Sequence, residues 1–195
     1  MKKILMVGAG SCQINAIKRM KAMGHMVFAA DYNQTTEGKR LSDVAIVADA
    51  FDTEAILEAA KSNGVDGILT VGTDQPVLTV AKVAEALQLN RFIDSDTAVL
   101  VTNKKYMKQR FKRFNLPTVP FALINRHFQS SDLSGLMPPF VIKPIDSQGQ
   151  RGIFIVHSID EIRLKFDEVI KYSRESEILV EQFYESTEVT VSGWV

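Results

Sequence analysis

The chain has 195 residues, 46% of them hydrophobic, so it can form one large domain or two small ones with separate cores. Its 23 basic and 23 acidic side chains balance, which excludes a general electrostatic attraction to nucleic acid or to an anionic membrane. The single cysteine, Cys12, cannot form an internal disulfide, and no signal-peptide pattern or membrane-spanning apolar run is present. We expect a globular, cytoplasmic protein without nucleic-acid or membrane partners.

The first half alternates short β-rich apolar runs with segments of helical periodicity, as βαβ units around a parallel sheet do. The predicted strands are residues 4–7, 26–30, 44–47 and 67–71. Apolar residues three and four apart predict a helix around Ile56 and another around Val80. The pattern indicates an α/β fold, with a Rossmann-like parallel-sheet domain over residues 1–97.

A different unit is predicted over residues 98–195. A basic helix over 103–115 ends before two prolines, which cannot continue it. Four strands and one helix of α+β character are predicted after it, at residues 140–143, 152–156, 162–170, 178–182 and 188–194. The last strand still alternates where the sequence stops, so we expect this second unit to be truncated at its C-terminus.

The first predicted strand leads into a glycine turn that opens a helix, where backbone N–H groups can hold an anion. Gly8 and Gly10 suit a dinucleotide-binding turn, but Gln13 replaces the third glycine of that motif. Asp31, at the end of the second strand, is a candidate ligand for a substrate or a ribose. Two alternatives remain open, an NAD(P)-binding oxidoreductase or sensor domain and a tight turn without any ligand.

A second candidate substrate surface follows the fourth strand. Thr73, Asp74 and Gln75 lie where that strand ends and Pro76 starts a helix. Ligands of open parallel sheets bind at the carboxyl ends of strands, so these side chains are well placed for a small substrate. Capping of the helix by Asp74 explains the same residues without a ligand.

Three segments of the second unit together suit ATP. Lys143 closes an apolar strand and can present its ammonium to a phosphate, and the polar loop after it holds two glycines. Glu181 and Glu188 flank a turn after another apolar strand, and Lys104 begins the basic helix. Taken singly, a hairpin loop, solvated carboxylates and a solvated helix face are the more common explanations of these residues.

The order of the motifs is more specific than any one of them. The sequence contains Asn103-Lys104 at a helix start, then Leu116-Pro-Thr-Val-Pro, Phe140-Val-Ile-Lys-Pro with its glycine loop, and Leu179-Val-Glu-Gln-Phe-Tyr-Glu. In this order the motifs resemble the ATP-grasp superfamily. The N-terminal unit resembles the pre-ATP-grasp domain of biotin carboxylases, carbamoyl phosphate synthetases and phosphoribosylglycinamide synthetase-like ligases.

The resemblance implies an ATP-dependent ligase that joins a small carboxylate to an amine or a thiol through an acyl phosphate. It implies phosphate-binding lysines, a mobile glycine-rich loop, an adenine-binding hinge and a ribose carboxylate. By position, these are Lys104, Lys143, Ser147, Gln148, Gly149, Gly152, Glu181, Gln182, Tyr184 and Glu188.

The family also uses Mg²⁺, whose ligands the resemblance places in a C-terminal lobe, so no metal ligand is expected in this chain. We therefore expect the piece to be inactive by itself. A non-catalytic subunit whose missing lobe comes from another chain stays open as an alternative, as does a homodimer.

Overall fold

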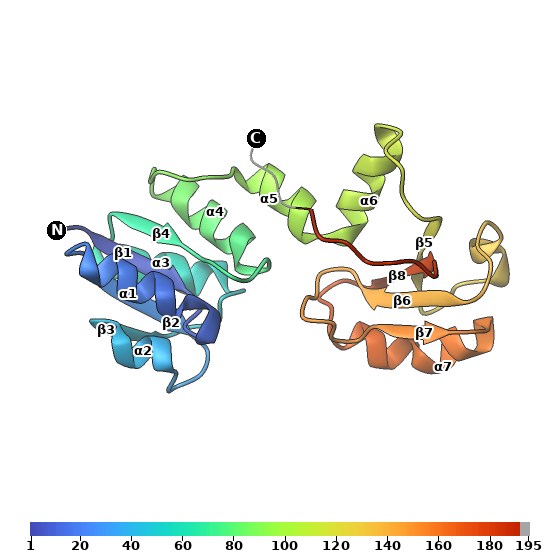
Figure 1. The fold of residues 1–195 in the computed structure, drawn as a ribbon, viewed down its shortest axis with the longest axis horizontal. Coiled ribbons are helices and arrows are strands. Elements are labelled where there is room, and N and C mark those ends of the chain that lie inside the picture. The colour runs from blue at the N-terminus through green and yellow to red at the C-terminus, as the bar shows by residue number, and fades with distance from the viewer. Residues whose placement is uncertain (192–195) are drawn as a thin grey trace. The chain divides into compact units, whose positions relative to one another are not determined.

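The computed structural model describes residues 1–191 and divides after Met107 into two compact units (Figure 1). The first unit contains a parallel sheet and the second an antiparallel sheet, so the mixed α/β class is confirmed. The expected domain boundary at residues 97 and 98 falls inside a helix, α5 (Ser95–Thr102). Within the described residues, no helix is both long and apolar enough to cross a membrane.

The first unit is built on four parallel strands in the order β3-β2-β1-β4. The strands are β1 (Lys3–Val7), β2 (Met26–Asp31), β3 (Val44–Val47) and β4 (Gly67–Leu69). The helices are α1 (Ile14–Ala22), α2 (Glu37–Leu41), α3 (Thr53–Asn63), α4 (Pro76–Ala86) and α5, with a short 3-10 turn at Ser11–Gln13.

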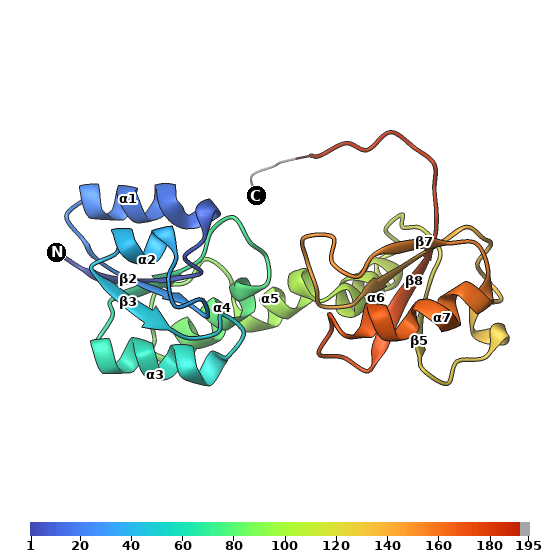
Figure 2. The same ribbon diagram turned by 90° about the horizontal axis from the view of Figure 1, so that it is seen from below.

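Alternation along β1 explains why both faces of this sheet are covered. Leu5 points into a core with Ile56 of α3 and Val80 of α4, whereas Met6 points into a second core with Ile17 of α1. Successive strand residues face opposite sides, so the apolar run of β1 serves both layers. Figure 2 shows α1 on one side of the sheet and α3 on the other.

The second unit has four antiparallel strands in the order β5-β8-β6-β7. The strands are β5 (Phe121–Asn125), β6 (Phe140–Pro144), β7 (Phe154–Val156) and β8 (Glu177–Gln182). The helix α6 (Lys104–Arg113) runs across the division between the units, and α7 (Ile159–Ile170) packs on the sheet through Ile162 and Phe166 (Figure 1). A second 3-10 turn lies at Ser130–Leu133.

One predicted strand is absent over the part of it that the structure describes. Residues 188–191 belong to no strand, because no ladder partner pairs with them among the described residues, and the rest of the predicted 188–194 strand lies outside those residues. The alternating pattern indicated strand propensity, but a strand exists only where a neighbour supplies hydrogen bonds. Conversely, β5 is a strand that the sequence analysis did not predict.

Candidate functional site

The two faces of the antiparallel sheet differ in chemistry. Along β6, Phe140 and Ile142 enter the core beneath α7, so Val141 and Lys143 lie on the opposite face. Direct cross-strand partners share a face, and Val141 is paired with Glu181 of β8 on one side and with Ile155 of β7 on the other. This second face therefore carries charged groups on an apolar floor.

Glu181 joins two lysines on this face. Its Oε1 lies 2.5 Å from Nζ of Lys108 on α6, and its Oε2 forms an ion pair with Nζ of Lys143. The Glu181 side chain is 7% exposed and that of Lys108 is 9% exposed, whereas Lys143 is 21% exposed. Two cations and one anion leave this cluster with a net charge of +1 when all three groups are ionised.

The protonation of Glu181 is decided by a competition. Burial favours the neutral carboxyl and raises the pKa, but hydrogen bonds and the charges of Lys108 and Lys143 outweigh it. The net result is a pKa of Glu181 below its usual value, so the carboxylate is ionised at neutral pH. Glu181 therefore supplies a negative charge between the two lysines at neutral pH.

Lys108 has further contacts that hold it in place. Its Nζ donates to Oγ1 of Thr118 at 2.6 Å and lies 5.7 Å from the centroid of the Phe121 ring, at the start of β5. The run of basic residues in this helix predicts a solvated face, but the Lys108 side chain is buried. Its position three residues before Phe111, on the same helix face, was the signal that its stem is covered.

The structure brings together Lys143 and Glu181 among the ATP contacts expected from the sequence. Gln182 accepts a hydrogen bond from the Met137 N–H at 3.3 Å, while Tyr184 is 58% exposed and Glu188 is also exposed. Lys104 belongs to the first compact unit, whereas Lys143 and Glu181 belong to the second.

Both ends of the predicted glycine loop contact the segment at residues 172–174, which follows α7. Before it, the Asp146 carboxylate accepts hydrogen bonds from Ser173 Oγ at 2.5 Å and from the Arg174 N–H, and pairs with the Arg174 guanidinium at 2.9 Å. After it, Gly152 packs against Tyr172, where an added Cβ would lie 2.7 Å from a ring carbon.

Between these anchors the loop follows an unusual backbone path. Gly149 has a φ of +67° with open space where a Cβ would lie, and Gln150 has a φ of +58°. Ser147 and Gln148 are half-buried. The expected loop residues therefore form one hairpin connection whose ends are fixed by Asp146 and Gly152.

In the glycine turn of the first unit, backbone N–H groups donate hydrogen bonds to side chains of the same unit. The Ala9 N–H donates to Asp31 Oδ2 and the Gly10 N–H donates to Gln13 Oε1, both at 3.0 Å. Gln13 Nε2 donates in turn to the Val71 carbonyl at 2.5 Å. These are the N–H groups that would face a dinucleotide phosphate, and Gly8, with its φ of +90°, makes the bend that brings them together.

The other proposed substrate surface is partly structural. Gln75 is buried and donates from Nε2 to the Thr102 carbonyl at 3.1 Å, so it links the start of α4 to the end of α5. Asp74 is exposed and Thr73 is half-buried at the same edge of the sheet. Asp74 and Thr73 are thus the members of this set with accessible surface.

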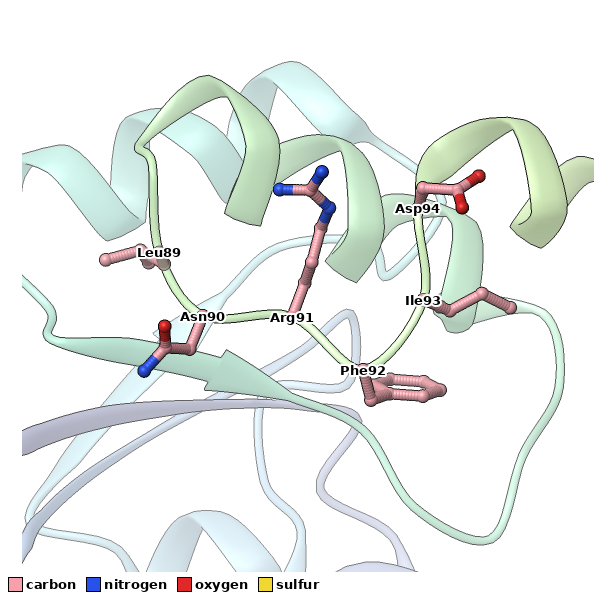
Figure 3. Close-up of a pocket in the computed structure, with 6 residues that line it drawn as sticks. All are labelled: Leu89, Asn90, Arg91, Phe92, Ile93 and Asp94. Atoms are coloured by element: carbon pink, nitrogen blue, oxygen red, sulfur yellow. The ribbon is translucent and has the colours of Figure 1, made fainter. Parts of the chain in front are cut away.

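The first unit also has an open depression of about 420 Å³ along the connection between α4 and α5 (Figure 3). It is lined by Leu89, Asn90, Arg91, Phe92, Ile93 and Asp94. None of the residues expected to bind ATP or substrate takes part in it. Across residues 1–191, no group of three or more His, Cys, Asp or Glu side chains is placed to hold a metal ion.

No protein-family profile matches the chain, but curated relatives do. It is 23% identical over 201 residues to the formate-dependent phosphoribosylglycinamide formyltransferase of Prochlorococcus marinus subsp. pastoris, covering 97% of this chain and 50% of the relative. It is 25% identical over 209 residues to the phosphoribosylamine–glycine ligase of Chlorobaculum tepidum, covering 97% of this chain and 47% of the relative. The chain thus spans about half the length of these relatives.

Solved structures agree on the fold. The biotin carboxylase domain of Hydrogenobacter thermophilus 2-oxoglutarate carboxylase, in complex with MgADP, ADP and bicarbonate, matches with a TM-score of 0.74 at 20% identity over 94% of this chain and 44% of that one. The homologues are ATP-dependent ligases of the ATP-grasp type, and the resemblance found in the sequence is confirmed.

Proposed function

We propose that this chain is the ATP-binding part of an ATP-grasp ligase, which activates a small carboxylate as an acyl phosphate and transfers it to an amine or a thiol. In this proposal, residues 1–97 are the pre-ATP-grasp domain and residues 98–195 are the N-terminal part of the ATP-grasp domain. The whole enzyme would act in the cytoplasm, alone or as a homodimer.

The observation that carries the proposal is the placement of Lys143. Its ammonium lies on the face of the antiparallel sheet that α7 leaves uncovered, in a cluster with a surplus positive charge and beside the apolar side chains of Val141 and Ile155. A cation next to an apolar floor suits a ligand with a phosphate chain and a flat base. The relatives and the fold match support the same assignment.

In this proposal each residue has a separate role in binding the nucleotide. Lys143 would bind a phosphate, and backbone N–H groups of the loop at residues 147–152 would contact other phosphate oxygens. The strand edge at Glu181, Gln182 and Tyr184 would meet the adenine, and Glu188 would accept hydrogen bonds from the ribose. Lys104 would supply the second phosphate-binding cation.

Magnesium belongs to this chemistry in the family, where it offsets charge on the transferred phosphoryl group. The described residues do not fit such a site, because they offer no cluster of acidic or imidazole ligands. We assign no step to a metal on this part of the protein. In this proposal, the ligands of the metal would lie outside the described residues.

The internal hydrogen bonds of the glycine turn support a structural role for it over dinucleotide binding. Two N–H groups that would bind a pyrophosphate already donate to Asp31 and Gln13. The carboxylate of the substrate would then lie near Thr73 and Asp74, at the accessible edge of the same sheet.

Thermal denaturation of the intact natural chain tests the proposal. A ligand that binds only the folded state raises the melting temperature according to its concentration relative to its dissociation constant. We expect ADP to raise the melting temperature and NADH to leave it unchanged. Stabilisation by NADH, with ADP inert, would overturn the assignment.

A further inference from the structure

One residue of the Glu181 cluster has no role in the function proposed above. Lys108 and Lys143 contact different oxygens of the same carboxylate, Oε1 and Oε2 respectively. They differ in freedom, because Lys108 is buried and has a second partner in Thr118, whereas Lys143 is the more exposed of the two. The two ion pairs are therefore unequal.

We propose that Lys108 is a positioning residue that keeps Glu181 paired, so that Lys143 can leave the carboxylate and bind a phosphate oxygen of the nucleotide. The inference rests on the proposed ATP site and adds to it the residue that makes the exchange possible. Glu181 holds Lys143 in position until an anion replaces it. Lys108 holds Glu181 throughout.

The physical reason is the cost of an unpaired buried charge. Glu181 is buried, so removing its last cationic partner would leave a desolvated carboxylate without compensation. With Lys108 on Oε1, the departure of Lys143 still leaves one ion pair. Without Lys108, Glu181 would retain Lys143 and compete with the incoming phosphate.

The surroundings of Lys108 fit a fixed partner. Its Nζ is held by the Thr118 hydroxyl and lies over the Phe121 ring, which together restrict it to the position beside Oε1. Lys143 is the penultimate residue of β6, and three residues separate it from the loop at residues 147–152 that is proposed to contact the phosphates. The geometry thus separates a permanent pair from an exchangeable one.

The test measures the affinity of the intact natural chain for ATP and for adenosine by calorimetry. Loss of one charge-assisted contact changes affinity by about tenfold or more. Lys108→Met is therefore expected to lower the affinity for ATP by about that factor and the affinity for adenosine by less than about twofold. Lys108→Arg, which keeps the charge, is expected to retain most of the ATP affinity. Lys112→Met removes an exposed charge from the same helix and serves as the matched control, with ATP affinity nearly unchanged.

The decisive variant is the double change Lys108→Met with Glu181→Gln. The neutral glutamine no longer traps Lys143, and it leaves the backbone of residue 181, the part expected to meet the adenine, unchanged. ATP affinity is therefore expected to return to within about threefold of the wild-type value. A double variant as weak as Lys108→Met would overturn the inference, because Lys108 would then contact the phosphate itself or support the fold. If Lys108→Met does not fold, the double variant decides alone by the same comparison with the wild type.

The proposed function fails in a distinguishable way. If the wild-type chain does not bind ATP, or if Lys143→Ala binds it normally, the ATP site itself is wrong. If ATP binding depends on Lys143 but Glu181→Gln gives no rescue of Lys108→Met, the ATP site stands and the positioning role of Lys108 is wrong.

Discussion

Lys143 and Glu181 form an ion pair diagonally across neighbouring antiparallel strands, since Lys143 is in register with Leu179 and Glu181 with Val141. Residues two apart on a strand share a face, so the register alone places both charges on the side opposite α7. The pair needs no loop rearrangement to form. The strand register therefore determines where the Lys143 ammonium lies on the sheet.

Replacing Lys143 with alanine is expected to weaken ATP binding by about tenfold to a hundredfold while adenosine affinity changes by less than about threefold. The reason is that the change removes a phosphate contact and leaves the strand edge that meets the base. Calorimetric titration with both ligands measures the difference, with Lys171→Ala as an exposed lysine control. Equal losses for ATP and adenosine would show instead that Lys143 supports the fold.

The stability of the second unit is expected to fall with acid in a way that depends on Glu181. Its pKa in the folded chain is below the ordinary value of 4.5, so its ion pairs add stability above that value, and the contribution disappears as the pH falls through the folded pKa. Urea unfolding from pH 7 to pH 3 should show a steeper loss for the wild type than for Glu181→Gln. Parallel pH profiles for the two proteins would contradict this account.

Two glycines of the same loop should respond differently to alanine. Both have positive φ, which costs an alanine about 1 kcal/mol. At Gly149 the new Cβ meets open space, whereas at Gly152 it would lie 2.7 Å from Tyr172 and 3.0 Å from Pro144. Chemical unfolding should therefore show a cost of about 1 kcal/mol for Gly149→Ala and about 2 to 4 kcal/mol for Gly152→Ala. Equal costs would mean that Tyr172 and Pro144 move aside freely.

Gln13 is expected to act as a structural part of the first glycine turn. Gln13→Ala leaves the Gly10 N–H and the Val71 carbonyl without the partner they have now, at a cost of about 1 to 3 kcal/mol. The exposed Gln109→Ala is the control, with a change within about 0.5 kcal/mol. Unfolding free energies of the two variants provide the comparison, and a neutral Gln13→Ala would return this turn to the set of candidate ligand sites.

The sequence predicted the two kinds of sheet because their signals are local. The continuous apolar run of β1 and the period of α3 and α4 indicated a sheet buried on both faces, and the structure has that arrangement. It also predicted Lys143 at the end of an apolar strand. The short strand β5 was missed because its segment, Phe121–Asn125, follows two prolines and carries no clear alternation.

The sequence predicted some of the charged residues of the site, but it did not predict how they pair. Residue type and strand position determined that Lys143 and Glu181 carry charge at strand ends, since these properties depend on a few neighbouring residues. Which charges meet was decided by the tertiary structure, because the pairing of Lys108 on α6 with Glu181 on β8 joins two residues that lie far apart in the chain. A basic helix in water and a lysine fixed beside a buried carboxylate have the same local sequence, and only the fold distinguishes them.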